Sequence, residues 1–289
     1  MKKYFISTLL ISSTLFASNN PITFDKTYGG KEHDIAKSVI KLDDGYLIAG
    51  DTKSFHKDRD FNAYVIKIDK HGEKLWSKTY GGEDDEHING LTKFGKDFVF
   101  VGSTKSFDMR NQSFYFANID NNGKMNWEKT YYRNDNNYYY GNDIIADGKN
   151  LVIAGVEKHL EFFNAKINPM LFKINSDGDM VWRGYYGGKD EDRANTVINT
   201  KDGYIMAGET ETYGHGDFDA FVVGLNKKGK REWFHAYGGK DNEVAHDIIE
   251  TKDGYILVGS TDSFGLNYKN VYVVKIDKRG KTIWQHSYG

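Results

Sequence analysis

The chain has 289 residues, of which 39 are basic and 41 acidic, so its formal charge is −2. Such a balance argues against an extended nucleic-acid surface, which needs concentrated Lys and Arg, and no nucleic-acid partner is expected. The chain has no cysteine, which excludes disulfides and a lipid attached to an N-terminal cysteine.

Residues 1–17 are typical of a secretory signal peptide. Lys2 and Lys3 precede a mostly apolar run from Tyr4 to Phe16, which is too short to span a bilayer comfortably. Ala17 lies where signal peptidase requires a small residue, so we expect cleavage after it. An uncleaved N-terminal anchor is the alternative. We expect no membrane span after signal cleavage, and a periplasmic or secreted location.

A repeat of about 51 residues follows the signal peptide. Each copy ends in a segment such as "KLWSKTYGG", and a tyrosine stands four residues after each tryptophan. The tryptophans are Trp76, Trp127, Trp182, Trp233 and Trp284, and Phe24 stands where a sixth would be. A fixed period of this length indicates a repeat architecture.

Each repeat divides into four segments that are rich in β-branched and aromatic residues and show no helical period. In the first repeat they are "IAKSVIKL", "YLIAGDT", "AYVIKID" and "KLWSKTY". "DDGY" or "KDGY" joins the first two segments in three repeats. Asp or Asn followed three residues later by Gly joins the last two, which favours a tight turn closed by a left-handed glycine.

Four antiparallel strands per repeat, five times over, predict a β-propeller. The chain resembles the bacterial and archaeal secreted propeller repeats that carry Tyr-Gly-Gly, Asp-Gly-Tyr and a late Trp, from residue 22 to residue 289. The resemblance implies the fold and says little about function. We predict an all-β, five-bladed propeller of four-stranded antiparallel blades. The expected single domain is 18–289, with repeats 28–79, 80–130, 131–185, 186–236 and 237–289.

Residues 22–28 are surplus to five complete blades, so the prediction includes one surplus N-terminal strand. It either adds a fifth strand to the last blade or replaces "TIWQHSY" there. The Trp segment should be the outermost strand of each blade. Trp and Tyr four residues apart point to one face of a strand, so they should pack against a neighbouring blade as part of the core.

The loops that follow Tyr-Gly-Gly are acidic, for example "EDDEH" from Glu83 and "KDEDR" from Lys189. Carboxylates that converge near a propeller axis can hold a hard cation such as calcium. The alternative is solvated acids, some of which cap turn amides. None of the loops has EF-hand spacing, and we expect neither a metal nor another cofactor.

The third repeat departs most from the pattern. Its Tyr-Gly-Gly is replaced by "YYRNDNNYYYGND", and its other long loop reads "VEKHLEFFNAKINP". Tyr, Asn and Arg in exposed loops make good contact surfaces, with drift in an idle loop as the alternative. Tyr139 and Arg133 are the first candidates. The full set of candidate binding residues is Tyr131, Arg133, Tyr138, Tyr139, Tyr140, His159, Phe162 and Phe163.

No catalytic motif is present: the sequence has no G-x-S-x-G, H-E-x-x-H or P-loop. We therefore predict an exported, non-enzymatic propeller, no catalytic residues, and a role as a protein-binding or scaffold module with an unknown protein partner. A lectin-like, glycan-binding propeller is the alternative, and a hydrolase is the third possibility.

Because no single acidic loop holds a complete ligand set, a chelator should leave the melting temperature unchanged. Thermal unfolding with and without calcium checks this. An upward shift that saturates with calcium concentration would show that the acids converge on an ion.

Overall fold

The computed structural model describes residues 23–55, 60–107, 111–131, 136–160 and 165–289. In these ranges the protein contains twenty β-strands and no helix, so no described helix crosses a membrane. Each set of four consecutive strands forms one antiparallel sheet, in the order of the chain apart from direction. The prediction of an all-β protein with five four-stranded blades is confirmed.

The strands have the following bounds. The first blade is β1 (Asp34–Lys41), β2 (Gly45–Thr52), β3 (Asn62–Asp69) and β4 (Lys74–Tyr80). The second is β5 (Glu86–Phe94), β6 (Asp97–Thr104), β7 (Ser113–Ile119) and β8 (Met125–Tyr131). The third is β9 (Tyr138–Asp147), β10 (Asn150–Leu160), β11 (Ala165–Ile174) and β12 (Met180–Tyr185).

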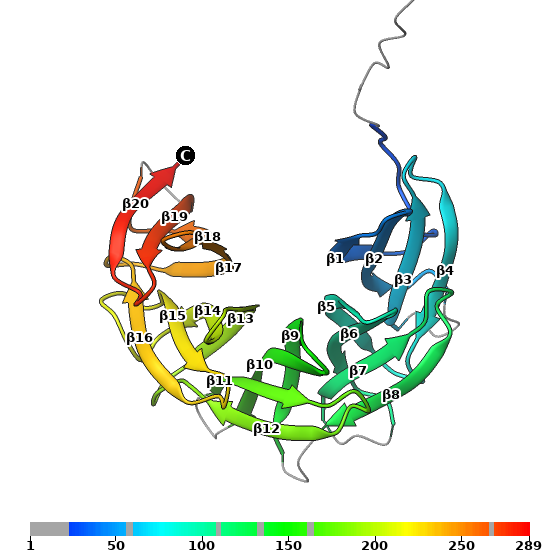
Figure 1. Cartoon of the computed structure of the whole chain (residues 1–289), viewed down its shortest axis with the longest axis horizontal. Helices are drawn as coiled ribbons and strands as arrows, with labels where there is room; N and C mark the ends of the chain where they lie inside the picture. The colour runs from blue at the N-terminus through cyan, green and yellow to red at the C-terminus, as the bar shows by residue number, and fades with distance from the viewer. Residues whose placement is uncertain (1–22, 56–59, 108–110, 132–135, 161–164, 266–268) are drawn as a thin grey trace, which may run out of the picture.

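The fourth blade is β13 (Asp192–Asn199), β14 (Gly203–Thr210), β15 (Asp219–Asn226) and β16 (Arg231–Tyr237). The fifth is β17 (Glu243–Thr251), β18 (Gly254–Thr261), β19 (Asn270–Asp277) and β20 (Thr282–Tyr288). The first strand of each blade lies innermost and the fourth outermost, as Figure 1 shows.

The five blades form an open arc rather than a closed ring. In Figure 1 each blade lies beside the next, but the fifth and first blades stand apart, on either side of an opening. The cores lie between successive blades. Leu47 and Val65 of the first blade, for example, share one buried cluster with Phe100 and Tyr115 of the second. Such shared clusters bury large apolar side chains that neither sheet covers alone.

In the first four blades, the Trp and Tyr at the end of the outer strand connect that blade to the next. The Tyr80 hydroxyl donates to the carbonyl of Gly123 at 2.8 Å, and the Trp76 indole donates to the carbonyl of Asn121 at 3.1 Å. Tyr186 and Tyr237 donate in the same way to Gly229 and Gly280. The prediction that Trp and Tyr pack against a neighbouring blade is therefore confirmed for the first four blades, where the tryptophans are half-buried, and is wrong for the exposed Trp284 and Tyr288 of the fifth.

The turn between the third and fourth strands explains why glycine recurs there. Gly123 has a φ of 71°, which favours glycine, and a Cβ atom on it would lie 2.9 Å from the Trp76 ring. The Asp120 side chain accepts hydrogen bonds from the amides of Asn122 and Lys124. The predicted turn of Asp or Asn with a left-handed glycine is confirmed, and this glycine also receives the preceding blade's tryptophan.

The surplus N-terminal segment differs from the prediction. Its described part forms no strand, and it lies against the first blade rather than the last. The Tyr28 hydroxyl donates to the carbonyl of Gly72 at 2.7 Å, and the rings of Phe24 and Tyr46 lie 6.2 Å apart. It neither adds a strand to the fifth blade nor replaces β20, because β20 is itself paired with β19.

Tyr237→Phe should lower the free energy of unfolding by about 1–2 kcal/mol, because the Gly280 carbonyl loses its buried donor. Tyr288 is the matched control: it occupies the same position in the fifth blade, where no following blade covers it. Tyr288→Phe should leave stability almost unchanged. Urea denaturation of both variants checks this, and equal losses would contradict the role given to the hydroxyl.

Candidate functional site

Most of the acidic loops end in a carboxylate that anchors its own blade. The first residue of the inner strand is Asp34, Glu86, Asp192 or Glu243, and it pairs in register with a threonine of the second strand. Glu86, for example, accepts from the Thr104 hydroxyl at 2.6 Å and from the Gly82 amide at 2.9 Å. These acids therefore hold the Tyr-Gly-Gly loop by accepting from its amides. This agrees with the alternative in which some of the loop acids cap turn amides.

In the third blade the carboxylate lies on the second strand and the hydroxyl on the inner strand, the reverse of the other blades. Tyr139 occupies the carboxylate position on β9, and Glu157 faces it on β10 in place of threonine. The Tyr139 hydroxyl donates to Glu157 Oε1 at 2.8 Å, and only 1% of Tyr139 is exposed. The prediction that Tyr139 is a leading contact residue is therefore corrected, because it belongs to the core.

The other candidates of the third repeat are divided. Tyr131 is half-buried and packs against Phe172, and His159 Nε2 lies 3.3 Å from Glu157 Oε2. Tyr138 and Tyr140 are half-buried in the innermost strand. Arg133, Phe162 and Phe163 lie outside the described residues. The described candidates thus do not form a single exposed patch.

A β-bulge recurs in every inner strand, and in the second, third and fourth blades its side chain reaches the next blade. The bulged residues, which have no register partner, are Lys37, Asn89, Asn142, Asn195 and His246. The side-chain amides of Asn89, Asn142 and Asn195 donate to a backbone carbonyl of the following inner strand at 2.7–2.9 Å. Bulges therefore fix the inner strands side by side around the axis.

The first polar cluster on this inner face joins the first two blades. Asp51 of β2 is buried, and its Oδ2 lies 2.7 Å from Lys37 Nζ and 2.8 Å from His87 Nδ1. Its Oδ1 accepts from the Ile88 amide at 2.8 Å. Burial works against the charge of Asp51, but the hydrogen bonds from His87 and Lys37 outweigh it and lower the pKa of this carboxyl.

The second cluster joins three consecutive blades. The residue after the bulge is Asp143 in β9, Thr196 in β13 and Asp247 in β17. The Thr196 hydroxyl lies 3.0 Å from Asp143 Oδ2 and 3.3 Å from Asp247 Oδ1. Asp143 also accepts from the Val197 amide at 2.9 Å. Two carboxyl groups therefore share one hydroxyl, and Asp247 is exposed to solvent.

The environments of the two carboxyl groups differ. Burial raises the pKa of Asp143 to about 6, and the charge of Asp247 adds to this rise. The hydrogen bonds from Val197, Ile144 and Thr196 act in the opposite direction. Asp143 can therefore hold a proton at mildly acidic pH, as a general acid requires.

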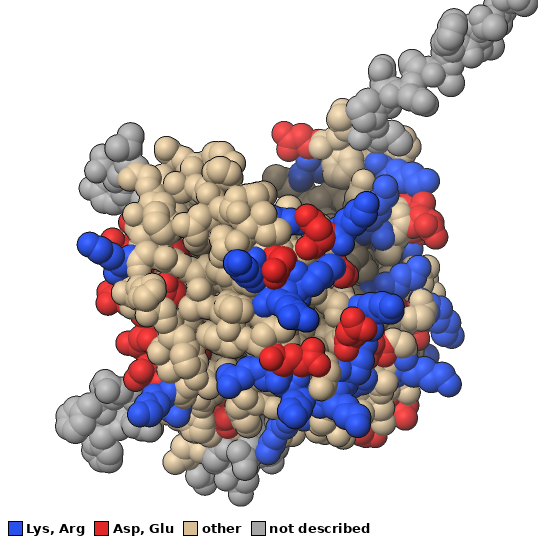
Figure 2. Space-filling model, turned by 60° about the vertical axis from the view of Figure 1, so that its left-hand side comes forward, with Lys and Arg blue, Asp and Glu red and all other residues tan. Residues whose placement is uncertain are grey.

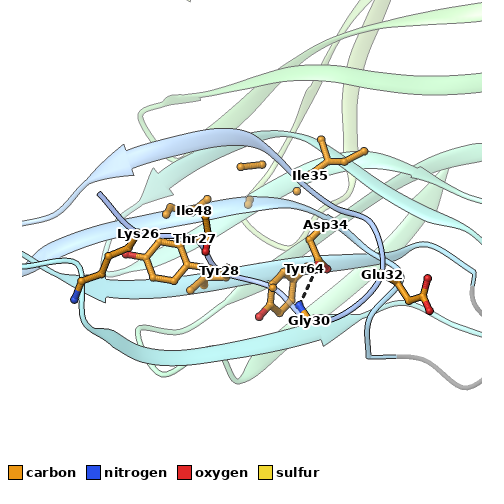
Figure 3. Close-up of a pocket in the computed structure, with 14 residues that line it drawn as sticks. Lys26, Thr27, Tyr28, Gly30, Glu32, Asp34, Ile35, Ile48 and Tyr64 are labelled. Carbon is orange, nitrogen blue, oxygen red and sulfur yellow. Dashed lines mark hydrogen bonds between the residues drawn. The ribbon is translucent and has the colours of Figure 1, made fainter. Parts of the chain in front are cut away.

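A cavity of about 480 Å³ lies elsewhere, between the N-terminal segment and the first blade. Figure 3 shows Tyr28 and Lys26 from the segment together with Ile48 and Tyr64 from the blade. Two carboxylates line it, Glu32 and Asp34, and Asp34 is already bonded to the Gly30 amide and to Thr52 and Ser54. The cavity is thus large enough for a small ligand, but the described residues that line it include no pair of carboxyl groups available for catalysis.

Sequence reasoning missed Asp51, His87, Asp143 and Asp247. The signal that could have found them is that the residue types differ between repeats at fixed positions, two in the inner strand and one, that of Asp51, in the second strand. A comparison that treats the repeats as equivalent does not use these differences. Within the described ranges, no three His, Asp or Glu side chains are grouped to hold a metal ion. The expectation that no metal is needed stays a prediction.

Comparison with known proteins identifies the fold. No protein-family model matches the sequence, and no curated protein is significantly similar to it. A subtype N10 neuraminidase-like protein of A/little yellow-shouldered bat has a TM-score of 0.53 and 8% identity, over 91% of this chain and 86% of that one. The apocarotenoid oxygenase of Synechocystis has a TM-score of 0.50 and 8% identity, over 84% and 58%.

The Bombyx mori GH32 β-fructofuranosidase follows with a TM-score of 0.48 and 9% identity, over 86% of this chain and 63% of that one. The two neighbours with TM-scores of 0.50 or more are, by name, a neuraminidase-like protein and an oxygenase. The prediction of a non-enzymatic binding or scaffold module, with no catalytic residues, is corrected on this ground. At 8–9% identity the likeness itself establishes the propeller fold alone.

Asp51→Ala should lower the free energy of unfolding by about 2–4 kcal/mol at pH 7, because it removes the buried carboxylate that pairs with Lys37 and leaves the Ile88 amide without its acceptor. The folded-state pKa of Asp51 is lowered, so its contribution is present above the unfolded value of about 4 and is lost as pH falls through the folded value.

Urea denaturation at pH 7 and pH 3 checks both statements. Asp179→Ala is the control, because it removes an exposed ion pair with Lys129 and should change little. A difference between wild type and Asp51→Ala that stays constant with pH would contradict the assignment.

Proposed function

We propose that the protein is a hydrolase of the propeller class that cleaves glycosidic bonds with Asp143 and Asp247. The observation that carries the proposal is the carboxyl pair joined through Thr196 on the inner face. Glycoside hydrolysis characteristically uses two carboxyl groups whose environments separate their roles.

The geometry supports one division of roles. One oxygen of each carboxyl group contacts the Thr196 hydroxyl, so these two oxygens are no more than about 6.3 Å apart. A separation this short favours double displacement over the wider, single-displacement arrangement. Asp143, whose pKa lies near 6, is the proton donor, and Asp247 is the nucleophile. The Thr196 hydroxyl positions both groups.

The reaction then proceeds in two balanced steps. Asp143 gives its proton to the glycosidic oxygen while Asp247 attacks the anomeric carbon and the bond to the leaving group breaks. Asp143, now a carboxylate, takes a proton from water, and the resulting hydroxide displaces Asp247 and restores the free pair. No other reactant than water is needed.

Aromatic side chains on the inner strands suit a sugar substrate. Tyr138 and Tyr140 are half-buried on β9, the inner strand that also carries Asp143. Partly exposed aromatic faces offer an apolar surface with polar groups beside it, as the faces and hydroxyls of a sugar require. This agrees with the glycan partner considered from the sequence.

Asp143→Asn and Asp247→Asn should each lower kcat/KM about 100-fold or more on a panel of aryl glycosides, as loss of an acid or nucleophile does. Wild-type activity should fall as pH rises through about 6, because Asp143 must carry the proton. Glu250→Gln, in an exposed ion pair with Lys278, is the control and should retain activity.

Glycoside turnover that survives Asp143→Asn, or a wild-type protein inactive on the whole panel, would contradict the proposal. Circular dichroism of each variant should match the wild type, so that loss of activity is not loss of fold.

We also propose that the chain is exported after cleavage at Ala17, and that it belongs to the secreted propeller repeats that it resembles. The basic start and the apolar run of residues 4–16 support export. Mass measurement of the protein purified from a secreting host tests the cleavage, because an intact signal peptide would add the first 17 residues.

A further inference from the structure

Residues 24–30 occupy the position that an outer strand and its Tyr-Gly-Gly hold at the other blade junctions. Tyr28 donates to the carbonyl of Gly72 as Tyr80 does to that of Gly123. A Cβ on Gly72 would lie 2.6 Å from the Phe24 ring, which takes the place of a tryptophan. The Gly30 amide donates to Asp34 at 2.8 Å, as Gly82 donates to Glu86.

This segment lacks the sheet to which such a strand belongs. Each of β4, β8, β12, β16 and β20 pairs with the third strand of its blade. In contrast, residues 24–28 make no backbone hydrogen bond with any strand in the described part of the chain. Their peptide groups are thus free to pair with an added strand.

The first blade offers a surface on which strands of a preceding blade fit. Three residues of the first blade, Ile48, Tyr64 and Ile66, occupy the register positions that Phe100, Tyr115 and Ala117 hold in the second blade. In the second blade these positions are buried against β2 and β3 of the preceding blade. In the first blade they border the cavity of about 480 Å³ (Figure 3). The Tyr64 hydroxyl is buried there without a hydrogen-bond partner among the described residues.

The fifth blade presents the opposite half of the same junction. Val258 is 41% exposed, whereas Ala49, its counterpart in the first blade, is 1% exposed against the second blade. Tyr288 is 58% exposed and its counterpart Tyr80 only 7%. Figure 2 shows a broad area free of charged side chains beside a mixture of basic and acidic groups. Exposed apolar side chains gathered on one blade, here Val258, Val271 and Tyr288, mark an interaction surface.

We propose that the opening between the fifth and first blades binds a three-stranded antiparallel meander from another polypeptide. Residues 24–28 pair with its third strand and serve as the outer strand of a sixth blade. One face of the meander fills the cavity beside Tyr64, and the other covers Val258 and Tyr288. This is β-augmentation, in which backbone hydrogen bonds give affinity and alternate side chains fill the apolar faces.

A three-stranded meander fits the opening better than a complete four-stranded blade does. If the fifth blade of this chain, or of a second copy, docked on the first blade, Tyr288 would need the Gly72 carbonyl that Tyr28 already holds. A meander without a fourth strand has no such conflict. Figure 1 shows the opening bounded by β17–β20 on one side and β1–β4 on the other.

The test uses the mature protein and a synthetic polypeptide with the sequence of residues 238–277, which carries three strands of the repeat and no fourth. Adding it should raise the melting temperature and slow amide exchange of residues 24–28 at least 10-fold. The control polypeptide carries Val258→Lys and Val271→Lys, which place charges on the face that meets the cavity, and it should have no effect.

A protein variant with Phe24→Ala and Tyr28→Ala tests the outer strand, and it should bind the polypeptide at least 10-fold more weakly. Absence of protection at residues 24–28 would overturn the proposal. So would a concentration-dependent dimer of the unmodified protein that protects Tyr288, or equal effects of the test and control polypeptides.

Discussion

The structure depends on a hydrogen bond from the tyrosine of one blade to a glycine carbonyl of the next. Tyr80, Tyr186 and Tyr237 each make it, and the glycine has a left-handed φ that leaves room for the preceding tryptophan or phenylalanine ring. A blade therefore completes its core only when another blade follows it. The inner strands are aligned as a result, and the bulges that carry the candidate site are set beside one another.

Repetition supplies the backbone of the site, and departures from repetition supply its chemistry. The residue after the bulge is Ser38, Gly90, Asp143, Thr196 or Asp247 in successive blades. Only in the last three do acid, hydroxyl and acid stand in sequence, which brings two carboxyl groups to one oxygen. The same backbone thus carries the ion pair of Asp51 and Lys37 at the first blade and a pair of carboxyl groups at the last three. Such variation on one scaffold is usual for folds that host many functions.

Much of the fold could be predicted from the sequence because its determinants are local. Asp69 and Gly72 define a turn within four residues, and the repeated Trp and Tyr define a face of one strand. The buried state of Tyr139 could not be predicted, because it depends on Glu157 across the sheet. The pair of Asp143 and Asp247 was equally hidden, since bulges shift the register and the two residues lie in blades separated by a third.

An arc of blades has two ends, and this makes the molecule resemble a solenoid more than a ring. In repeat arrays, stability is the sum of units and of interfaces between neighbours, so a terminal unit has one interface where an internal unit has two. In the described structure the fifth blade packs against the fourth alone, so it has one such interface where the second, third and fourth blades have two. Asp247 belongs to this terminal blade. Movement of the fifth blade relative to the fourth would therefore change the distance between the two carboxyl groups and leave the shared cores of the first four blades intact, so the geometry of the pair depends on a single blade interface.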